Sequence, residues 1–329
     1  MAPGTFYPNR LLISRRAFVA VGGAALISGA AHAQMKTLSI ATGGTGGVFY
    51  PLGGGLANIL SKLPGIQATA EVTGGSVDNL KLIGSGQSEI AFTQADAVYD
   101  AINGLDKFKS GKLALRTLMV LYPNQMHVVT VDGTGVSKVA DLKGKRVSTG
   151  SPGSATEVYA FRVLEASGLD KDRDIKRERL GAAESVNAIK DRKIDAFFWV
   201  GGLPTSAVTD LGATPGVKLR LIDHDDAVAK MNAKYANLYA TSVIKAGTYP
   251  GQDKDNLNSV VWNLLVTGDR MTDDLAYAIV KTVFDKQPDL IAVHREAENF
   301  SLKAQIKSNS PSPWHPGALK YFAERGIAM

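Results

Sequence analysis

The chain has 329 residues, with 37 lysines and arginines against 31 aspartates and glutamates, which gives a formal net charge of +6. It contains no cysteine, and this excludes disulfide bonds and thiolate metal sites. Basic residues are interspersed with acidic ones, as in the segment 171–179, so we expect no binding of nucleic acid.

The N-terminus has the features of an export signal. Arg15 and Arg16 precede an apolar stretch rich in glycine and alanine, which ends in small residues at Ala33. The paired arginines fit a twin-arginine signal, with the general secretory route as the alternative. We therefore predict that residues 1–33 are a signal peptide, that the mature chain begins near Gln34, and that the protein is periplasmic.

The first part of the mature chain alternates strand-like and helical patterns. We predict strands at 38–42, 67–73, 89–94, 116–122 and 127–132, with a break at 123–124 between the last two. We predict helices at 51–62, 78–85 and 95–103.

A glycine-rich segment, 42–55, follows the first strand. Glycine has no side chain, so the main chain can come close to a ligand. The start of the next helix also offers unpaired N–H groups to an anion. We expect Gly44, Thr45 and Gly46 to hold an anionic group; a tight strand–helix turn is the structural alternative. Tyr50 either donates its hydroxyl to the ligand or packs in the core.

Three more candidate ligand contacts follow in this part of the chain. Ser76 and Asn79 come after two glycines at the start of a helix, where Ser76 is alternatively the N-cap residue. Gln94 ends a buried strand at its carboxyl edge, where polar groups face a cleft in parallel α/β sheets.

The pattern then occurs a second time. We predict strands at 146–149, 176–180 and 195–197, and helices at 156–167 and 185–190. Helices between strands imply parallel sheets with right-handed crossovers, whose ligands bind beyond the carboxyl ends of the strands. Two copies predict two α/β lobes with a cleft between their facing loops. One continuous doubly wound sheet is the alternative.

The second copy supplies its own candidate contacts. Those at its small-residue loop and helix start are Ser151, Ser154, Ala155 and Thr156, for which ordinary helix capping is the alternative. Trp199, at the end of a strand, either covers the carbon chain of the ligand or belongs to the core. Arg146 and Arg162 are not candidates, because Arg146 begins a strand and Arg162 lies two turns into its helix.

The remaining sequence adds strands and a helical C-terminal part. We predict strands at 219–222, 241–244 and 260–267, and helices from 273 onward with a break at 310–313. The histidines are isolated and lack metal-ligand spacing, so we predict no metal site. The glycine segment fits neither a P-loop nor a dinucleotide fingerprint, and we predict no cofactor.

An ordered set of short motifs runs through the mature chain, beginning with A-T-G-G-T-G-G-V-F-Y-P at 41–51. The others lie at 73–80, 91–96, 141–147, 152–157, 195–202, 247–252 and 315–318. Together they cover essentially the whole mature chain, which resembles the TAXI-type solute receptors of TRAP transporters.

The resemblance implies a periplasmic-binding-protein fold of the second type. Lobe one would be 35–122 plus 246–329, and lobe two 123–245. It also implies a non-catalytic receptor for glutamate, 2-oxoglutarate or a related small carboxylate, which delivers it to a sodium-driven TRAP membrane component, often a single fused protein. We expect a monomer. The alternatives are a periplasmic enzyme on the same scaffold and a ligand-sensing partner of a membrane kinase.

Overall fold

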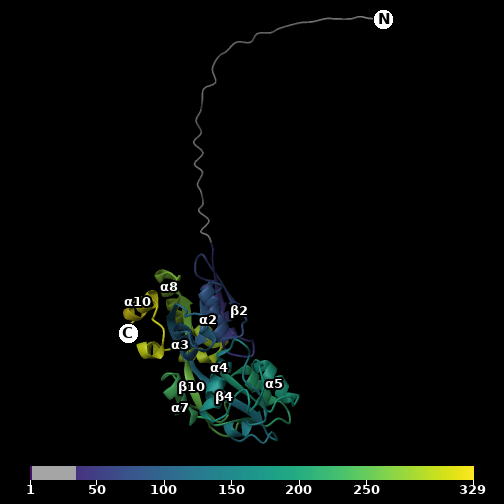
Figure 1. Cartoon of the computed structure of the whole chain (residues 1–329). Coiled ribbons are helices and arrows are strands. Elements are labelled where there is room, and N and C mark those ends of the chain that lie inside the picture. Colours follow the sequence, from purple (N-terminus) through teal and green to yellow (C-terminus); the bar gives the residue numbers. More distant parts are fainter. Residues whose placement is uncertain (2–34) are drawn as a thin grey trace, which may run out of the picture. The chain divides into compact units, whose positions relative to one another are not determined.

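The computed structural model describes Met1 and residues 35–329 (Figure 1). The predicted signal peptide, residues 1–33, thus lies outside the described residues apart from Met1. In the described part of the chain, no helix is both long enough and apolar enough to cross a membrane.

Lobe one contains the first copy of the pattern and the C-terminal helices. Its strands are β1 (Lys36–Ala41), β2 (Ile66–Glu71), β3 (Ile90–Gln94) and most of β10 (Asn256–Gly268). Its helices are α1 (Phe49–Leu60), α2 (Ser76–Ser85), α3 (Ala95–Asn103), α8 (Asp273–Asp285), α9 (Gln287–Val293) and α10 (Pro316–Glu324).

Lobe two contains the second copy. Its strands are β5 (Arg146–Ser148), β6 (Lys176–Glu178), β7 (Ala196–Gly201), β8 (Leu219–Leu221) and β9 (Ala240–Ile244). Its helices are α4 (Ala155–Ala166), α5 (Ala182–Lys190), α6 (Ser206–Ala213) and α7 (Ala227–Tyr235). The long strand β4 (Leu115–Val131) belongs to both lobes.

Helix ends follow the capping preferences of the sequence. α2 and α3 end at Gly86 and Gly104, whose φ angles of 76° and 71° favour glycine. α4 begins at Ser154, whose hydroxyl accepts a hydrogen bond from the main-chain N–H of Glu157. These ends fix where each helix leaves the sheet.

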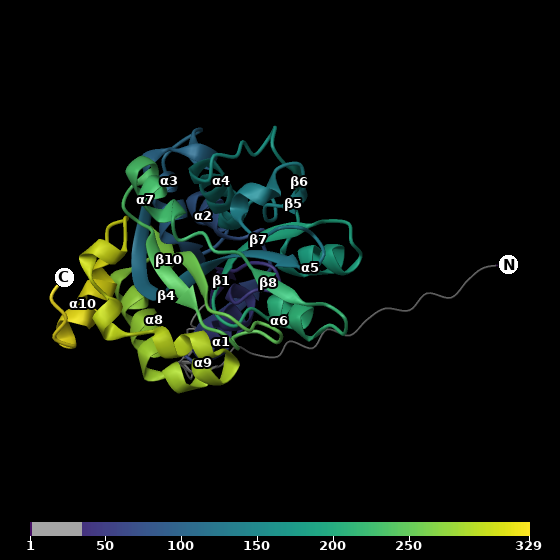
Figure 2. The same ribbon diagram turned by 90° about the horizontal axis from the view of Figure 1, so that it is seen from below.

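The two lobes have the same strand order. It is β2-β1-β3-β10-β4 in lobe one and β6-β5-β7-β4-β8 in lobe two, with the first three strands of each parallel and the others antiparallel to their neighbours. The predicted repeat is therefore confirmed. Because β4 and β10 run side by side from one lobe into the other, all strands also belong to one hydrogen-bonded sheet (Figures 1 and 2).

The predicted break at 123–124 is wrong, because β4 continues through it. The early part of β4 pairs with β10 and the later part with β7 and β8. Pro123 lies opposite Trp262, beside a register shift between Trp262 and Leu264. A proline lacks the N–H that a ladder needs, and strands accept it at such irregular positions.

Apolar side chains form two clusters. The larger includes Leu38 and other residues around the sheet of lobe one, and continues to Val163 of α4 and Met231 of α7 in lobe two. The smaller lies under α5 and α6 and includes Phe197 and Tyr249. The larger cluster thus joins the two lobes on the α4 side of the molecule.

The lobe boundaries stay a prediction. Tyr249 packs with the lobe-two residues Phe197 and Leu211, although the predicted boundary at 245–246 assigns it to lobe one. We propose that the chain returns to lobe one within β10 and that the segment after β9 belongs to lobe two.

Candidate functional site

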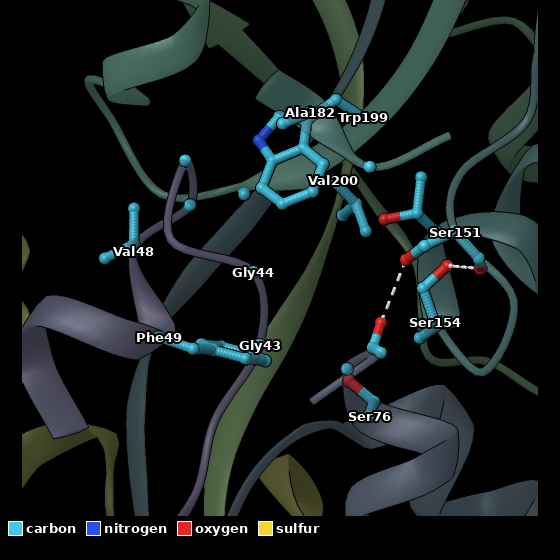
Figure 3. A pocket seen from close by; sticks show the side chains of 18 of the residues that line it. Gly43, Gly44, Val48, Phe49, Ser76, Ser151, Ser154, Ala182, Trp199 and Val200 are labelled. Carbon is cyan, nitrogen blue, oxygen red and sulfur yellow. Dashed lines mark hydrogen bonds between the residues drawn. The ribbon is translucent and has the colours of Figure 1, made fainter. Parts of the chain in front are cut away.

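A cavity of about 360 Å³ lies between the lobes, at the carboxyl ends of the parallel strands (Figure 3). From lobe one it is lined by residues 43–49 and 72–76. From lobe two it is lined by 154–156, 179–184 and 199–201, among others. This size and this position between lobes are typical of a small-molecule site.

Most of the predicted contacts meet at this cavity. The lining residues include Gly44, Thr45, Gly46, Ser76, Gln94, Ser151, Ser154, Ala155, Thr156 and Trp199. Trp199 lies within β7 rather than at its end, because that strand continues to Gly201. The structure thus brings together residues of both copies, which are as far apart as Gly44 and Trp199 in the sequence.

Two predicted contacts, Tyr50 and Asn79, do not line the cavity. Asn79 is fully buried, and its side-chain amide donates to the carbonyl oxygens of Thr42 (2.5 Å) and Phe92 (2.7 Å). It therefore joins the loop after β1 to the middle of β3. Tyr50 is half-buried one residue inside α1, and its neighbour Phe49 lines the cavity in its place.

Five helices begin at the cavity. Their N-cap residues Val48, Gly75, Gln94, Ser154 and Gly181, which precede α1, α2, α3, α4 and α5, all line it. At α1, α2, α3 and α5 no side chain caps the helix. The first N–H groups of a helix lack intrahelical partners and carry the positive end of its dipole, so this convergence suits an anion.

The serines at the cavity have different roles (Figure 3). Ser154 caps α4, and the Ser151 hydroxyl donates to the Gly74 carbonyl oxygen at 3.0 Å. Ser76 does not cap α2, because Gly75 with φ 119° occupies that position. The Ser76 hydroxyl is buried and has no hydrogen-bond partner among the described residues, which leaves it available to a ligand.

Among the cavity residues that were not predicted from the sequence are two polar residues of β4, Tyr122 and Asn124. Each is buried, and the Tyr122 hydroxyl, both Asn124 amide atoms and Gln94 Oε1 lack partners among the described residues. A buried polar group without a partner is costly, so these atoms favour a polar ligand. Tyr122 and Asn124 are two residues apart, so in a continuous strand they lie on the same face. The predicted break at 123–124 hid this signal.

Burial raises the pKa of Tyr122 well above the ordinary value for tyrosine, so its hydroxyl stays a hydrogen-bond donor. Tyr122→Phe is expected to lower ligand affinity about 10-fold, the low end for a hydrogen bond to a charged group. The free protein should be as stable as the wild type or more stable, because a buried unpaired hydroxyl is removed. Calorimetric titration and urea unfolding measure the two effects.

The matched control for that variant is Tyr159→Phe. Tyr159 is also fully buried, but it does not line the cavity. Removal of the Tyr159 hydroxyl should leave the ligand affinity unchanged. Equal affinities of the wild type and Tyr122→Phe would show that Tyr122 does not contact the ligand.

An apolar wall faces the polar groups. It includes Val48, Phe49, Val200 and the half-buried Trp199. Trp199 approaches the main chain of Gly47 so closely that a Cβ atom there would lie 2.9 Å from Trp199 Cζ2. Glycine at position 47 is therefore required by this contact between the lobes.

Few charged groups lie at the cavity. Among the described residues, only Arg179 and Glu184 line it with a charged side chain. The Arg179 guanidinium is paired with the buried Glu157, with 2.7 Å between Nε and Oε1, and Lys107 lies 3.1 Å from the same carboxylate. Arg179 and Lys107 thus share one carboxylate, and an anion in the cavity would meet main-chain N–H groups and hydroxyls beside an arginine that already has a partner.

The lobes touch each other around the cavity. The carbonyl oxygen of Gly46 accepts from the N–H of Ala207 (3.3 Å) and the hydroxyl of Ser206 (3.1 Å). Elsewhere on the rim, the Asp78 N–H donates to the carbonyl oxygen of Gly153 at 3.0 Å. These contacts enclose the cavity. In the described part of the chain, no cluster of three or more histidine, aspartate or glutamate side chains is arranged to hold a metal ion.

Comparison with known proteins gives a family and a fold. Residues 40–326 match the model of the NMT1-like family. A protein of Bordetella bronchiseptica RB50 has a solved structure that is similar with a TM-score of 0.51 and 18% identity, over 87% of this chain and 88% of that one.

Two further solved structures have lower TM-scores. The alkanesulfonate-binding protein SsuA of Xanthomonas axonopodis pv. citri gives 0.47 with 16% identity, over 88% of this chain and 84% of that one. A putative L-cystine ABC transporter protein of Listeria monocytogenes gives 0.48 with 18% identity, over 80% and 95%. The fold assignment depends on the Bordetella structure and on the repeated sheet topology, and the predicted two-lobed α/β fold with an interlobe cleft is confirmed.

Proposed function

The chain belongs to the NMT1-like family, and with this premise we propose that it is a periplasmic receptor for a small organic anion. The observation that carries the proposal is the convergence of five helix N-termini on one interlobe cavity. The unpartnered polar atoms of Ser76, Gln94 and Tyr122 support it, because a ligand would supply the missing hydrogen bonds.

We propose a carboxylate as the anionic group, with glutamate, 2-oxoglutarate or a related acid as the ligand. Main-chain N–H groups and hydroxyls hold the carboxylate, and the wall around Trp199 contacts the carbon chain. A ligand that touches both lobes stabilises the closed form by its differential affinity for that form. The membrane partner then recognises the closed form.

We also propose which kind of membrane protein receives the ligand. The motifs of the sequence favour a TRAP-type component of the TAXI class, and an ABC importer is the alternative. Reconstituted uptake separates the two, because a TRAP component needs a sodium gradient and an ABC importer needs ATP. Export by a twin-arginine signal, the monomeric state and the lack of catalysis are proposed in the same way. Recovery of the ligand unchanged, by mass spectrometry, tests the last of these.

A thermal-shift screen tests the proposed ligand class. A ligand at 100 times its Kd adds about 2.7 kcal/mol to the free energy of unfolding, because it binds only the folded protein. In a protein of this size that raises Tm by about 5 °C. We expect a shift with at least one small carboxylate, and none with matched neutral amides. A panel of glutamate, 2-oxoglutarate and other small acids that leaves Tm unchanged would contradict the proposal.

A further inference from the structure

Trp199 is one of the lobe-two side chains that reach the glycine loop of lobe one, and it is the largest of them (Figure 3). The far edge of its indole, at Cζ2 and Cη2, lies 2.9 and 3.0 Å from where a Cβ atom of Gly47 would be. The indole N–H lies on the same side of the ring, two bonds from Cζ2, and its contacts determine how the ring stands in the cavity.

Thr205 holds that N–H. Trp199 Nε1 donates to the Thr205 hydroxyl at 2.9 Å, and this hydroxyl donates onward to the carbonyl oxygen of Gly202 at 2.8 Å. The main-chain N–H of Thr205 donates to the Tyr249 hydroxyl at 3.1 Å. Both Thr205 and Tyr249 are buried, so water does not compete for these bonds.

His127 completes a circuit of hydrogen bonds that returns to Trp199. Its Nδ1 lies 3.0 Å from the carbonyl oxygen of Gln125 and 3.2 Å from that of Trp199. Both are acceptors, so Nδ1 carries the proton and Nε2 accepts from the Tyr249 hydroxyl at 2.8 Å. Burial lowers the pKa of His127 to about 4, which keeps the ring neutral as this arrangement requires.

We propose that Thr205, Tyr249 and His127 are positioning residues for ligand recognition: their circuit fixes the Trp199 indole and thereby sets the width of the cavity. This inference rests on the proposed function. Trp199 is held at its indole N–H and at its own carbonyl oxygen, so the ring is placed before a ligand arrives. Such preorganisation strengthens binding of a carbon skeleton that fits and excludes a thicker one.

The test uses Thr205→Val, which removes the acceptor with little change of shape, and Thr205→Ser, which restores it. Tyr249→Phe, which cuts the circuit at another point, is a second variant in case Thr205→Val fails to fold. Thr209→Val is the matched control, because it removes a hydroxyl in the same helix that bonds only to the Thr205 carbonyl oxygen. Affinities are measured for glutamate, 2-oxoglutarate, hexanoate and phenylpyruvate.

We expect Thr205→Val and Tyr249→Phe to lower the affinity for the acid that the wild type binds best by about 10-fold. This is the effect of losing one hydrogen bond of the circuit that holds Trp199. Selectivity should change as well: the affinity for phenylpyruvate, divided by the affinity for the acid that the wild type binds best, should rise by a similar factor. Acrylamide quenching of Trp199 emission, after subtraction of a Trp199→Phe background, should increase without any ligand. Thr205→Ser and Thr209→Val should behave as the wild type.

Unchanged quenching and unchanged selectivity in both Thr205→Val and Tyr249→Phe would overturn the inference while leaving the receptor function intact. If the wild type binds none of the four acids at millimolar concentration, the proposed function fails for this ligand class and the inference falls with it. The two failures are therefore distinguished by the wild-type measurement alone.

Discussion

Gly46→Val is expected to lower ligand affinity by about 100-fold while leaving the free protein folded. A Cβ atom at Gly46 would lie 3.2 Å from Ala183 Cβ and 3.3 Å from Ala207 Cβ, both in lobe two. The two extra methyl groups of valine would then overlap with them when the lobes close. Overpacking of this kind costs about 1–3 kcal/mol, and the upper end corresponds to roughly 100-fold in affinity.

The loss should come from closure and not from the fold, because the atoms nearest to a Cβ atom at Gly46 belong to lobe two. Gly54→Val is the matched control, since Gly54 is exposed in α1 and a Cβ atom there would meet nothing within 4 Å. Calorimetric titration gives the affinities and thermal unfolding checks the fold. An affinity of Gly46→Val equal to that of Gly54→Val would show that this loop does not meet lobe two in the bound state.

Arg162→Leu is expected to destabilise the protein by about 3–5 kcal/mol, the cost of leaving a buried partner charge unpaired. Arg162 in α4 of lobe two is almost fully buried, 3.7 Å from the carboxylate of Asp96 and in hydrogen-bond contact with Asp100, both in α3 of lobe one. It also donates to the Tyr239 hydroxyl at 2.7 Å. Burial raises the pKa of Asp96 and raises that of Asp100 to about 6, although Arg162 opposes both shifts.

Urea unfolding measures this loss, and two further variants separate its causes. Arg173→Leu removes an exposed arginine that pairs with Asp170, and it should cost less than about 1 kcal/mol. Adding Asp96→Asn and Asp100→Asn to Arg162→Leu should recover part of the loss, because the unpaired carboxylates are then gone. A cost for Arg162→Leu no larger than that for Arg173→Leu would show that the charge cluster does not stabilise the contact between the lobes.

Most of the fold was predictable because each copy repeats the same local signals. Alternation of apolar runs with helical patterns located β1 to β3 and β5 to β7, and the glycines located the helix starts between them. The strand β4 was not predicted as one element, because Pro123 is ordinarily a strand breaker. Its pairing with two different sets of strands is a tertiary feature that no local pattern encodes.

The candidate site was predictable where it depends on the main chain. Gly44, Thr45 and Gly46 line the cavity. This was predictable because a glycine-rich loop at the carboxyl end of a parallel strand brings the main chain close to a ligand. Asn79 was misjudged, since its position at a helix start does not show that its amide joins β3 to the loop after β1. Asn124 was missed because its neighbour Pro123 suggested a turn.

The arginines show the same limit. Arg162 and Arg146 are each bound to carboxylates, Arg162 to Asp100 and Arg146 to Asp195, and neither lines the cavity. Their omission from the predicted site followed from their positions along a helix and a strand. Their actual partners come from segments far away in the sequence and could not be identified from it.

The most direct test of the account is a crystal structure of the protein with the acid that gives the largest thermal shift. We expect the anionic group at the starts of the helices α1 to α5, within hydrogen-bond distance of first main-chain N–H groups of these helices and of the Ser76 hydroxyl. The carbon chain should lie against Trp199. An acid bound outside the interlobe cavity, or held there by an arginine instead of these N–H groups, would contradict it.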